Sequence, residues 1–169
     1  MTIKPFEGNE LLKLADRLTG WFVERKAVTW RAASVYRNSN QSIAPGGGYV
    51  SITFTTVRQD TSSLFDISNP TRLTCPISGW YIVSAQCSMG PDLGAVNVKR
   101  AIRLAINGAG EANQDYWVPP GQVTTMSVAE LLFLDAGDYI ELQVSNGGLA
   151  AVNALAASFT PGLQAARMP

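Results

Sequence analysis

The stretch TRLTCPISGWYIVSAQCS at positions 71–88 predicts two β-strands separated by a tight turn. Pro76 and Gly79 bound the turn, because these residue types favour the backbone angles that turns require. The second strand is apolar on both faces over positions 80–85. A sandwich strand with one face in water should alternate instead. We therefore expect this strand to be covered twice, by the opposite sheet and by either another subunit or the N-terminal segment of the chain.

Short alternating runs continue on both sides of this stretch. Ile102, Leu104 and Ile106 share one face of a predicted strand, and positions 50–54 and 140–144 follow the same period of two. Asn107-Gly108 predicts a hairpin turn, because both residues tolerate positive φ. Strands are predicted near 30–37, 49–57, 71–75, 79–88, 99–106, 114–118, 123–134, 138–145 and 152–160. This spacing is typical of an all-β fold, and we expect a jelly-roll sandwich of about 8–10 antiparallel strands.

Residues 9–27 follow a helical pattern instead. Apolar side chains recur at helical spacing and so share one face: Leu11, Leu14, Ala15, Leu18 and Phe22, with Trp21 on the flank. We expect 1–28 to form an N-terminal helical anchor arm, 29–162 a jelly-roll head and 163–169 a C-terminal tail. The predicted anchor contacts are Leu11, Leu14, Leu18, Trp21 and Phe22.

Composition argues against most enzyme classes. The 169 residues include no histidine, which removes histidine-based triads, general bases and metal ligands. Lys plus Arg and Asp plus Glu are 13 each, so the chain lacks the basic excess of a nucleic-acid-binding protein. No apolar run reaches the ~18 residues of a membrane span, and the N-terminus lacks the apolar core of a secretory signal. We expect a non-enzymatic protein with no cofactor, no metal, no nucleic-acid partner and no membrane partner.

The two cysteines, Cys75 and Cys87, are predicted to be reduced and buried. Cys75 precedes the turn, so its neighbour across a hairpin lies near Trp80 or Tyr81, far from Cys87. A disulfide needs Cα atoms within ~7 Å. Reduced thiols fit assembly in a cytosol.

Two segments together resemble the globular heads of the complement-q and tumour-necrosis-factor superfamily. In the first, 72–85, a strand with proline and glycine leads into an aromatic-rich strand. In the second, 132–144, a Gly-Asp turn begins the penultimate strand, and the Ser-Phe pair within 157–162 closes the last one. The resemblance implies a jelly roll that assembles as a trimer around a threefold axis.

A narrower resemblance connects 40–43, 52–73 and 100–108 with the version of this head in tailed-bacteriophage virion proteins. Members of that group are mostly binding and structural modules. The chain departs from the group at its N-terminus, where the predicted helix replaces a collagen-like or fibrous stalk. This departure weakens a fibre-tip role.

The resemblance and the doubly apolar strand lead us to expect a homotrimer. Segment 131–134, Leu-Leu-Phe-Leu, repeats the apolar signal of the earlier strand. We predict a trimer interface of Trp80, Ile82, Leu132 and Leu134.

Several acidic residues have a functional and a structural interpretation. Asp60 and Asp66 bracket a loop of hydroxyl and apolar residues, and they could hold Ca²⁺ or cap turns. Asp135 and Asp138 could form an acid–base pair or bound a surface turn. Glu130 shares a strand row with apolar residues, which fits either an edge position or a polar threefold axis.

A partner or ligand surface is predicted around Tyr116, Trp117, Arg100 and Arg103. Exposed aromatic residues suit an interface or a ligand groove, and packing against a neighbouring subunit is the alternative. With Lys99, the two arginines could meet a phosphate or an acidic partner, or form a solvated strand face.

Together these features favour a bacteriophage virion protein, a trimeric decoration or cement protein on the capsid. Its partners would be its own copies and the major capsid protein, and it would be assembled in the host cytoplasm. The alternative is a tail-fibre or baseplate tip that binds a host surface receptor, a glycan, through loops 59–69 or 110–121. A small glycan-active enzyme is the third hypothesis, disfavoured by the missing histidine and the lack of a buried carboxylate pair.

Overall fold

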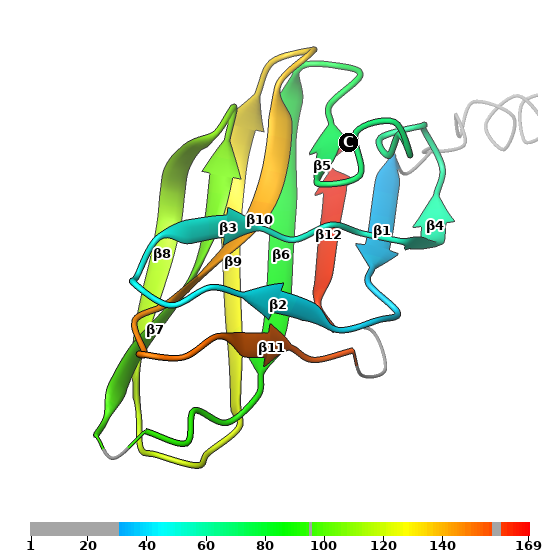
Figure 1. Ribbon diagram of the computed structural model, residues 1–169. Helices are drawn as coiled ribbons and strands as arrows, with labels where there is room; N and C mark the ends of the chain where they lie inside the picture. Colours follow the sequence, from blue (N-terminus) through cyan, green and yellow to red (C-terminus); the bar gives the residue numbers. More distant parts are fainter. Residues whose placement is uncertain (1–30, 95, 157–159) are drawn as a thin grey trace, which may run out of the picture. The chain divides into compact units, whose positions relative to one another are not determined.

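Two antiparallel β-sheets enclose one apolar core in the computed structural model, which describes residues 31–94, 96–156 and 160–169 (Figure 1). The strands are β1 (Ala32–Tyr36), β2 (Gln41–Ile43), β3 (Tyr49–Ser51), β4 (Thr56–Asp60), β5 (Arg72–Thr74), β6 (Gly79–Met89), β7 (Val98–Ile106), β8 (Ala109–Val118), β9 (Thr124–Leu134), β10 (Tyr139–Asn146), β11 (Val152–Ala154) and β12 (Gly162–Arg167). The all-β antiparallel jelly roll expected from the sequence is confirmed.

Sheet A has seven strands and sheet B has five. In sheet A the order is β2-β11-β6-β12-β1-β4, and β9 pairs with β6. β6 and β9 pair along their full length, from Gly79 opposite Leu134 to Met89 opposite Thr124. In sheet B the order is β3-β10-β7-β8, and β5 pairs with β10.

The core lies between the inward rows of the two sheets. Tyr81 and Val83 of β6 are fully buried, as are Ile102 of β7 and Leu142 of β10. The alternation that the sequence shows in these segments therefore corresponds to one face in the core and one outside. The hairpin between β7 and β8 turns at Asn107 and Gly108, with φ of 52° and 82°, as predicted.

Residues 163–169 are not a tail. Leu163 and Ala165 of β12 are buried in the core, and β12 pairs with β1 on one side and β6 on the other. Most side chains of its sequence, Gly-Leu-Gln-Ala-Ala-Arg, are small or weakly apolar, so the sequence shows no clear period of two. Neighbouring strands, not the segment's own composition, make it a strand.

Three further segments differ from the prediction. The strand predicted at 49–57 is two strands, β3 in sheet B and β4 in sheet A, because the chain crosses between the sheets there. β2 was not predicted, and within the described part of the strand expected at 152–160 only Val152–Ala154 forms a strand.

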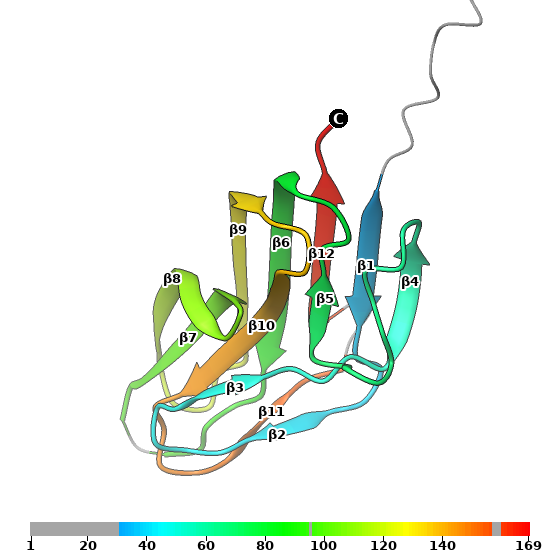
Figure 2. The ribbon, with the colours of Figure 1, turned by 90° about the horizontal axis from the view of Figure 1, so that it is seen from above.

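The chain enters and leaves the sandwich at one end. The Arg167 N–H donates to the Arg31 carbonyl, and the Met168 N–H donates to the Trp80 carbonyl. The loops that follow β6, β8 and β10 lie at the opposite end (Figure 2). The predicted helix at 9–27 and its anchor residues lie outside the described residues.

Candidate interaction surface

The outward-pointing residues of β1, β6, β9 and β12 form a surface without charged side chains. We call this surface the outer face of sheet A. Its main members are Ser34, Gln164, Ala166, Trp80, Ile82, Ser84, Gln86, Ser88, Thr125, Ser127, Ala129, Leu131 and Phe133. None of the outward-pointing residues in these four strands is Asp, Glu, Lys or Arg. A sheet face in water normally carries charged side chains, so this face has the composition of a surface that becomes covered.

One end of this face is a compact apolar strip. Trp80 lies opposite Phe133, and Ile82 lies opposite Leu131. Each of these four side chains is between 51% and 54% exposed. The rings of Trp80 and Phe133 meet edge to face, with centroids 5.6 Å apart, which fixes both side chains. Four large apolar residues thus form one continuous exposed strip.

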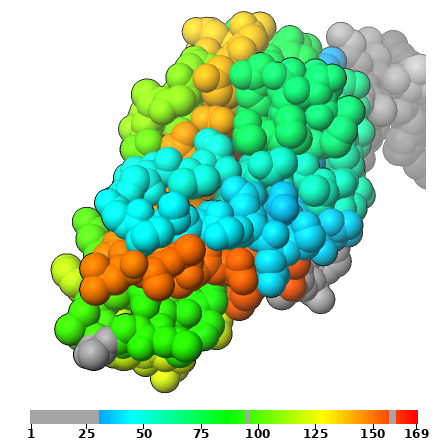
Figure 3. Space-filling model, viewed as in Figure 1, coloured from blue at the N-terminus to red at the C-terminus, as the bar shows by residue number. Residues whose placement is uncertain are grey.

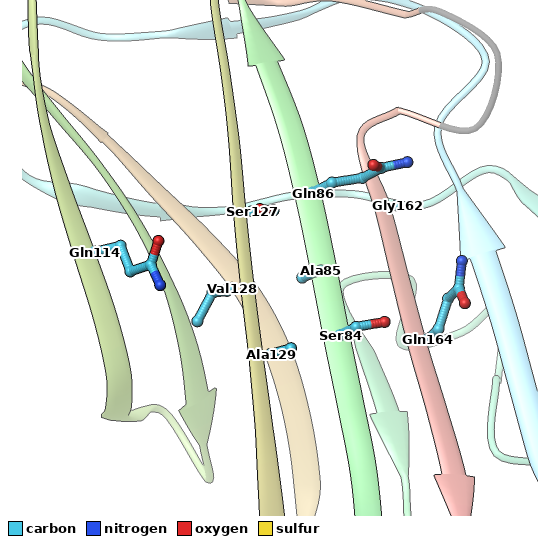
Figure 4. Close-up of a pocket in the computed structure, with 9 residues that line it drawn as sticks. All are labelled: Ser84, Ala85, Gln86, Gln114, Ser127, Val128, Ala129, Gly162 and Gln164. Atoms are coloured by element: carbon cyan, nitrogen blue, oxygen red, sulfur yellow. The ribbon is translucent and has the colours of Figure 1, made fainter.

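The other end of the face is hollow and polar. A groove of about 400 Å³ runs over β12, β6 and β9 to β8. It is lined by Ser84, Ala85, Gln86, Gln114, Ser127, Val128, Ala129, Gly162 and Gln164. Gln114 stands on the β8 side and Gln164 on the β12 side (Figure 4). Small residues in its floor and amide and hydroxyl groups on its walls suit a protruding, uncharged polypeptide edge.

The outer face of sheet B has the opposite character. Lys99 and Asp115 form an ion pair of 2.7 Å, whose hydrogen bond raises the pKa of Lys99 and lowers that of Asp115. The Arg103 guanidinium lies 3.8 Å from the centre of the Tyr49 ring and donates to Gln143 at 2.8 Å. Charges paired with their own neighbours are typical of a face exposed to water.

The predicted interface residues lie on two different surfaces. Trp80 and Ile82 belong to the exposed strip, whereas Leu132 and Leu134 are 8% and 0% exposed and point into the core. The sequence prediction selected the wrong row of β9, because both rows of 131–134 are apolar. Leu131 and Phe133 are the outward residues that it missed, and only the pairing with β6 identifies them.

The predicted ligand surface is also divided. Trp117 is 72% exposed and lies in the outward row of β8, and Arg103 lies on the same outer face of sheet B. Tyr116 packs against the core cluster, and Arg100 is fully buried. Arg100 donates instead to the Met89 carbonyl and to the Thr124 hydroxyl. The four residues therefore do not form one surface.

The acidic pairs act as turn caps. Asp60 accepts the N–H groups of Ser62, Leu64 and Phe65, and Asp66 accepts the N–H of Ser68. The hydrogen bonds from the Ser68 N–H and from the Asn69 side chain lower the pKa of Asp66. Among the described residues, no group of three or more acidic or cysteine side chains is arranged to hold a metal.

Asp135 and Asp138 bound the β9–β10 turn. The Asp138 carboxylate accepts the Asn107 side-chain amide and the Asp135 N–H, and these bonds lower the pKa of Asp138. Asp138 is therefore held in its charged form as a turn cap and is not the proton donor of an acid–base pair. Glu130 is exposed although it shares the inward row, because β9 is the edge strand beyond β6. This is the edge position considered from the sequence.

The two cysteines are free and buried, as expected. Burial raises the pKa of each thiol to about 12. A neutral buried thiol packs as a small apolar group and neither attacks a substrate nor binds a metal.

Three solved structures share this fold. The chain matches the globular domain of zebrafish complement 1qA with a TM-score of 0.58 at 16% identity, over 82% of this chain and 97% of that one. It matches murine APRIL with a TM-score of 0.60 at 11% identity, over 82% and 99%. It matches the Eiger TNF of S. frugiperda with a TM-score of 0.62 at 15% identity, over 83% and 94%.

These matches show that the chain has the fold of complement-q and tumour-necrosis-factor heads. No protein-family model and no curated protein matches the sequence. Across the described residues there is no helix of the length and apolarity that a bilayer crossing requires.

Proposed function

We propose that this chain is a non-enzymatic, homotrimeric bacteriophage virion protein that decorates the capsid. In this proposal the outer face of sheet A packs against the next copy, and residues 1–28 attach the trimer to the major capsid protein. The fold, the uncharged outer face and the sequence resemblance to phage virion heads support it. The single observation that carries self-association is the apolar strip of Trp80, Ile82, Leu131 and Phe133.

The energetic argument starts from the exposure of the strip. Covering a half-exposed large apolar side chain contributes on the order of 1 kcal/mol. A trimer repeats the strip at each of its interfaces, together with the groove, so the gain accumulates around the axis. On sheet B the paired charges would have to be desolvated, which makes that face a worse partner.

Replacing Ile82 with glutamate tests the strip. We expect Ile82→Glu to reduce the trimer to monomers in light-scattering measurements, because it places a charge in the apolar contact. Ile67→Glu is the matched control, since Ile67 is 69% exposed on the β4–β5 loop, away from the strip. Equal measured masses for Ile82→Glu and Ile67→Glu would contradict a trimer interface on the outer face of sheet A.

Attachment to a shell is tested on purified particles. A decoration protein is expected at hundreds of copies per particle, in a multiple of three, and a trimer lacking residues 1–28 is expected to lose particle binding. The mechanism is mechanical: a trimer that bridges shell subunits adds contacts that must break before the shell opens. Full binding by the truncated trimer would contradict the anchor.

The second candidate is a tail-fibre or baseplate tip that binds a host glycan. Trp117 favours it, because this exposed ring lies on the same strand as Asp115 and Asn113, which are joined by a hydrogen bond. Stacking on an aromatic ring beside planar polar groups suits a sugar. A copy number of a few to a few tens per particle would support this candidate over capsid decoration.

A further inference from the structure

The end of the sandwich opposite Arg31 and the end of β12 carries a second apolar surface. It is formed by the loops that follow β6, β8 and β10, at 91–97, 119–123 and 147–151. Four aliphatic side chains project from the described part of these loops, Leu93, Val96, Val123 and Leu149, with exposed fractions of 86%, 61%, 55% and 89%. We call these four residues the distal tip. The loops adjoin one another at the lower end of the molecule (Figure 3).

The distal tip is surrounded by uncharged residues. The three loop segments contain one ionisable residue, Asp92. Its side chain does not reach solvent, because Asp92 is only 3% exposed and its carboxylate accepts the Gly94 N–H. The positive charge of the buried Arg100 guanidinium faces this carboxylate from β7. The loops therefore keep their one charge beneath the surface and present only apolar and neutral groups.

Several peptide groups of the loops are bound internally. The Gly121 N–H donates to the Asp92 carbonyl at 2.7 Å, which joins the first two loops. The Gly147 N–H donates to the Lys99 carbonyl at 2.8 Å. Asn146 is fully buried, and its side chain accepts the Gly148 N–H and donates to the Ala150 carbonyl. For these groups, internal bonding lowers the cost of taking loop backbone out of water.

Residue types change in order with distance from the distal tip. The aliphatic side chains are at the loops, and Trp117 follows near the end of β8. Lys99 lies directly opposite Trp117, at the same distance from the tip, and its ion-pair partner Asp115 comes two residues before Trp117 in β8, on the side away from the tip. Aliphatic groups first, then an aromatic ring beside a lysine, and then a carboxylate match the polarity profile of a lipid–water interface.

We propose that the distal tip inserts into the interfacial region of a lipid bilayer. The four aliphatic side chains enter the acyl boundary, Trp117 and Lys99 lie at headgroup level, and Asp115 remains in water. A protein partner would be met by a flatter surface with arginine and aromatic anchors, and the three loops contain neither residue type. A glycan would be met by several convergent polar groups, whereas the described parts of the loops expose only two polar side chains, Asn97 and Gln122. The proposal does not depend on the capsid role. It differs from the expectation of no membrane partner, because the four residues come from three loops that are separate in the sequence.

Vesicle flotation tests the proposal with the full-length chain. The probes are vesicles of phosphatidylcholine and vesicles of phosphatidylcholine with one quarter phosphatidylglycerol. We expect binding to both at similar strength, because the tip carries no charge. Leu93→Glu and Leu149→Glu should each weaken binding by about tenfold or more, since each removes the transfer of one leucine. Ile67→Glu, an equally exposed aliphatic position outside the tip, should bind as the unmodified chain does.

A second measurement reports insertion directly. A polarity-sensitive dye attached to a Leu93→Cys variant should shift to shorter emission wavelength when vesicles are added, because the dye enters an apolar environment. The native thiols of Cys75 and Cys87 are buried and do not compete for the dye.

Three outcomes would overturn the proposal. The first is a wild-type chain that stays unbound with both vesicle types. The second is lipid binding that Leu93→Glu and Leu149→Glu leave unchanged. The third is a concentration-dependent association between trimers that Leu93→Glu abolishes while lipid is not bound, which would assign the distal tip to a second copy of this chain.

Discussion

Gly148 shows how closely the loops at the distal tip are packed. A Cβ atom placed on Gly148 would lie 1.9 Å from the Asp92 carboxylate and 3.0 Å from the Asn146 side-chain oxygen. Both partners are buried and short, so neither can swing away. Gly148→Ala is expected to lower the free energy of unfolding by about 1–3 kcal/mol in urea denaturation.

Gly48 provides the matched control for this change. It has no heavy atom within 4 Å of its added Cβ and no positive φ, so Gly48→Ala should leave stability close to that of the unmodified chain. Equal stability of the two variants would contradict the packing described around Asp92.

The cysteines give a prediction about reactivity. With a thiol pKa of about 12, roughly one thiolate in ten thousand is present at pH 8, and both side chains are buried as well. We expect neither Cys75 nor Cys87 to react with a thiol reagent in the folded protein, and both to react in denaturant. Rapid labelling of one thiol under native conditions would contradict its burial, at the end of β5 for Cys75 or within β6 for Cys87.

The facing of a residue could be predicted from the sequence only where the two alternating rows of its strand differ in residue type. Ile102 and Leu104 alternate with alanine and arginine, and they share one face of β7 as predicted, the face that is buried in the core. In 131–134 all four residues are apolar, so the outward members, Leu131 and Phe133, are defined only by their register against β6. A pattern with period two carries no information about direction when both rows are alike.

At the scale of elements, β12 is the decisive correction. It lies between β1 and β6 and contributes Leu163 and Ala165 to the core. Removing residues 163–169 should therefore abolish cooperative unfolding, because β1 and β6 would both lose a hydrogen-bonded neighbour. Circular dichroism during heating checks this, and a truncated chain that still melts cooperatively would contradict the central place of β12.

Strand length affects how closely the bounds of an element could be predicted. β6, β7, β9 and β10 are long, and the sequence predicted each of them to within one residue at either end. β2, β3, β5 and β11 are three residues each, which is shorter than the window that a period-two signal needs. Of these four, only β5 was predicted closely, because the turn at Pro76 marks its end; β3 and β11 were merged into longer predicted strands, and β2 was missed.

At the scale of the whole molecule, the two sheets have different outer surfaces. Sheet B carries paired charges such as Lys99 and Asp115, and sheet A carries none in its outward rows over β1, β6, β9 and β12. The distal tip is a third surface, assembled from loops more than twenty residues apart. Sequence patterns within one segment cannot show such a surface, because its members come together only in the fold.

The association state of the chain in solution tests the central claim most directly. Light scattering of the full-length protein, recorded over a hundredfold range of concentration, should give a mass three times the 18.1 kDa of the chain. A constant trimer mass would agree with burial of the outer face of sheet A between copies. A monomer throughout the concentration range, or a dimer, would contradict the proposed trimer. The apolar strip would then have to bind a partner other than two further copies of this chain.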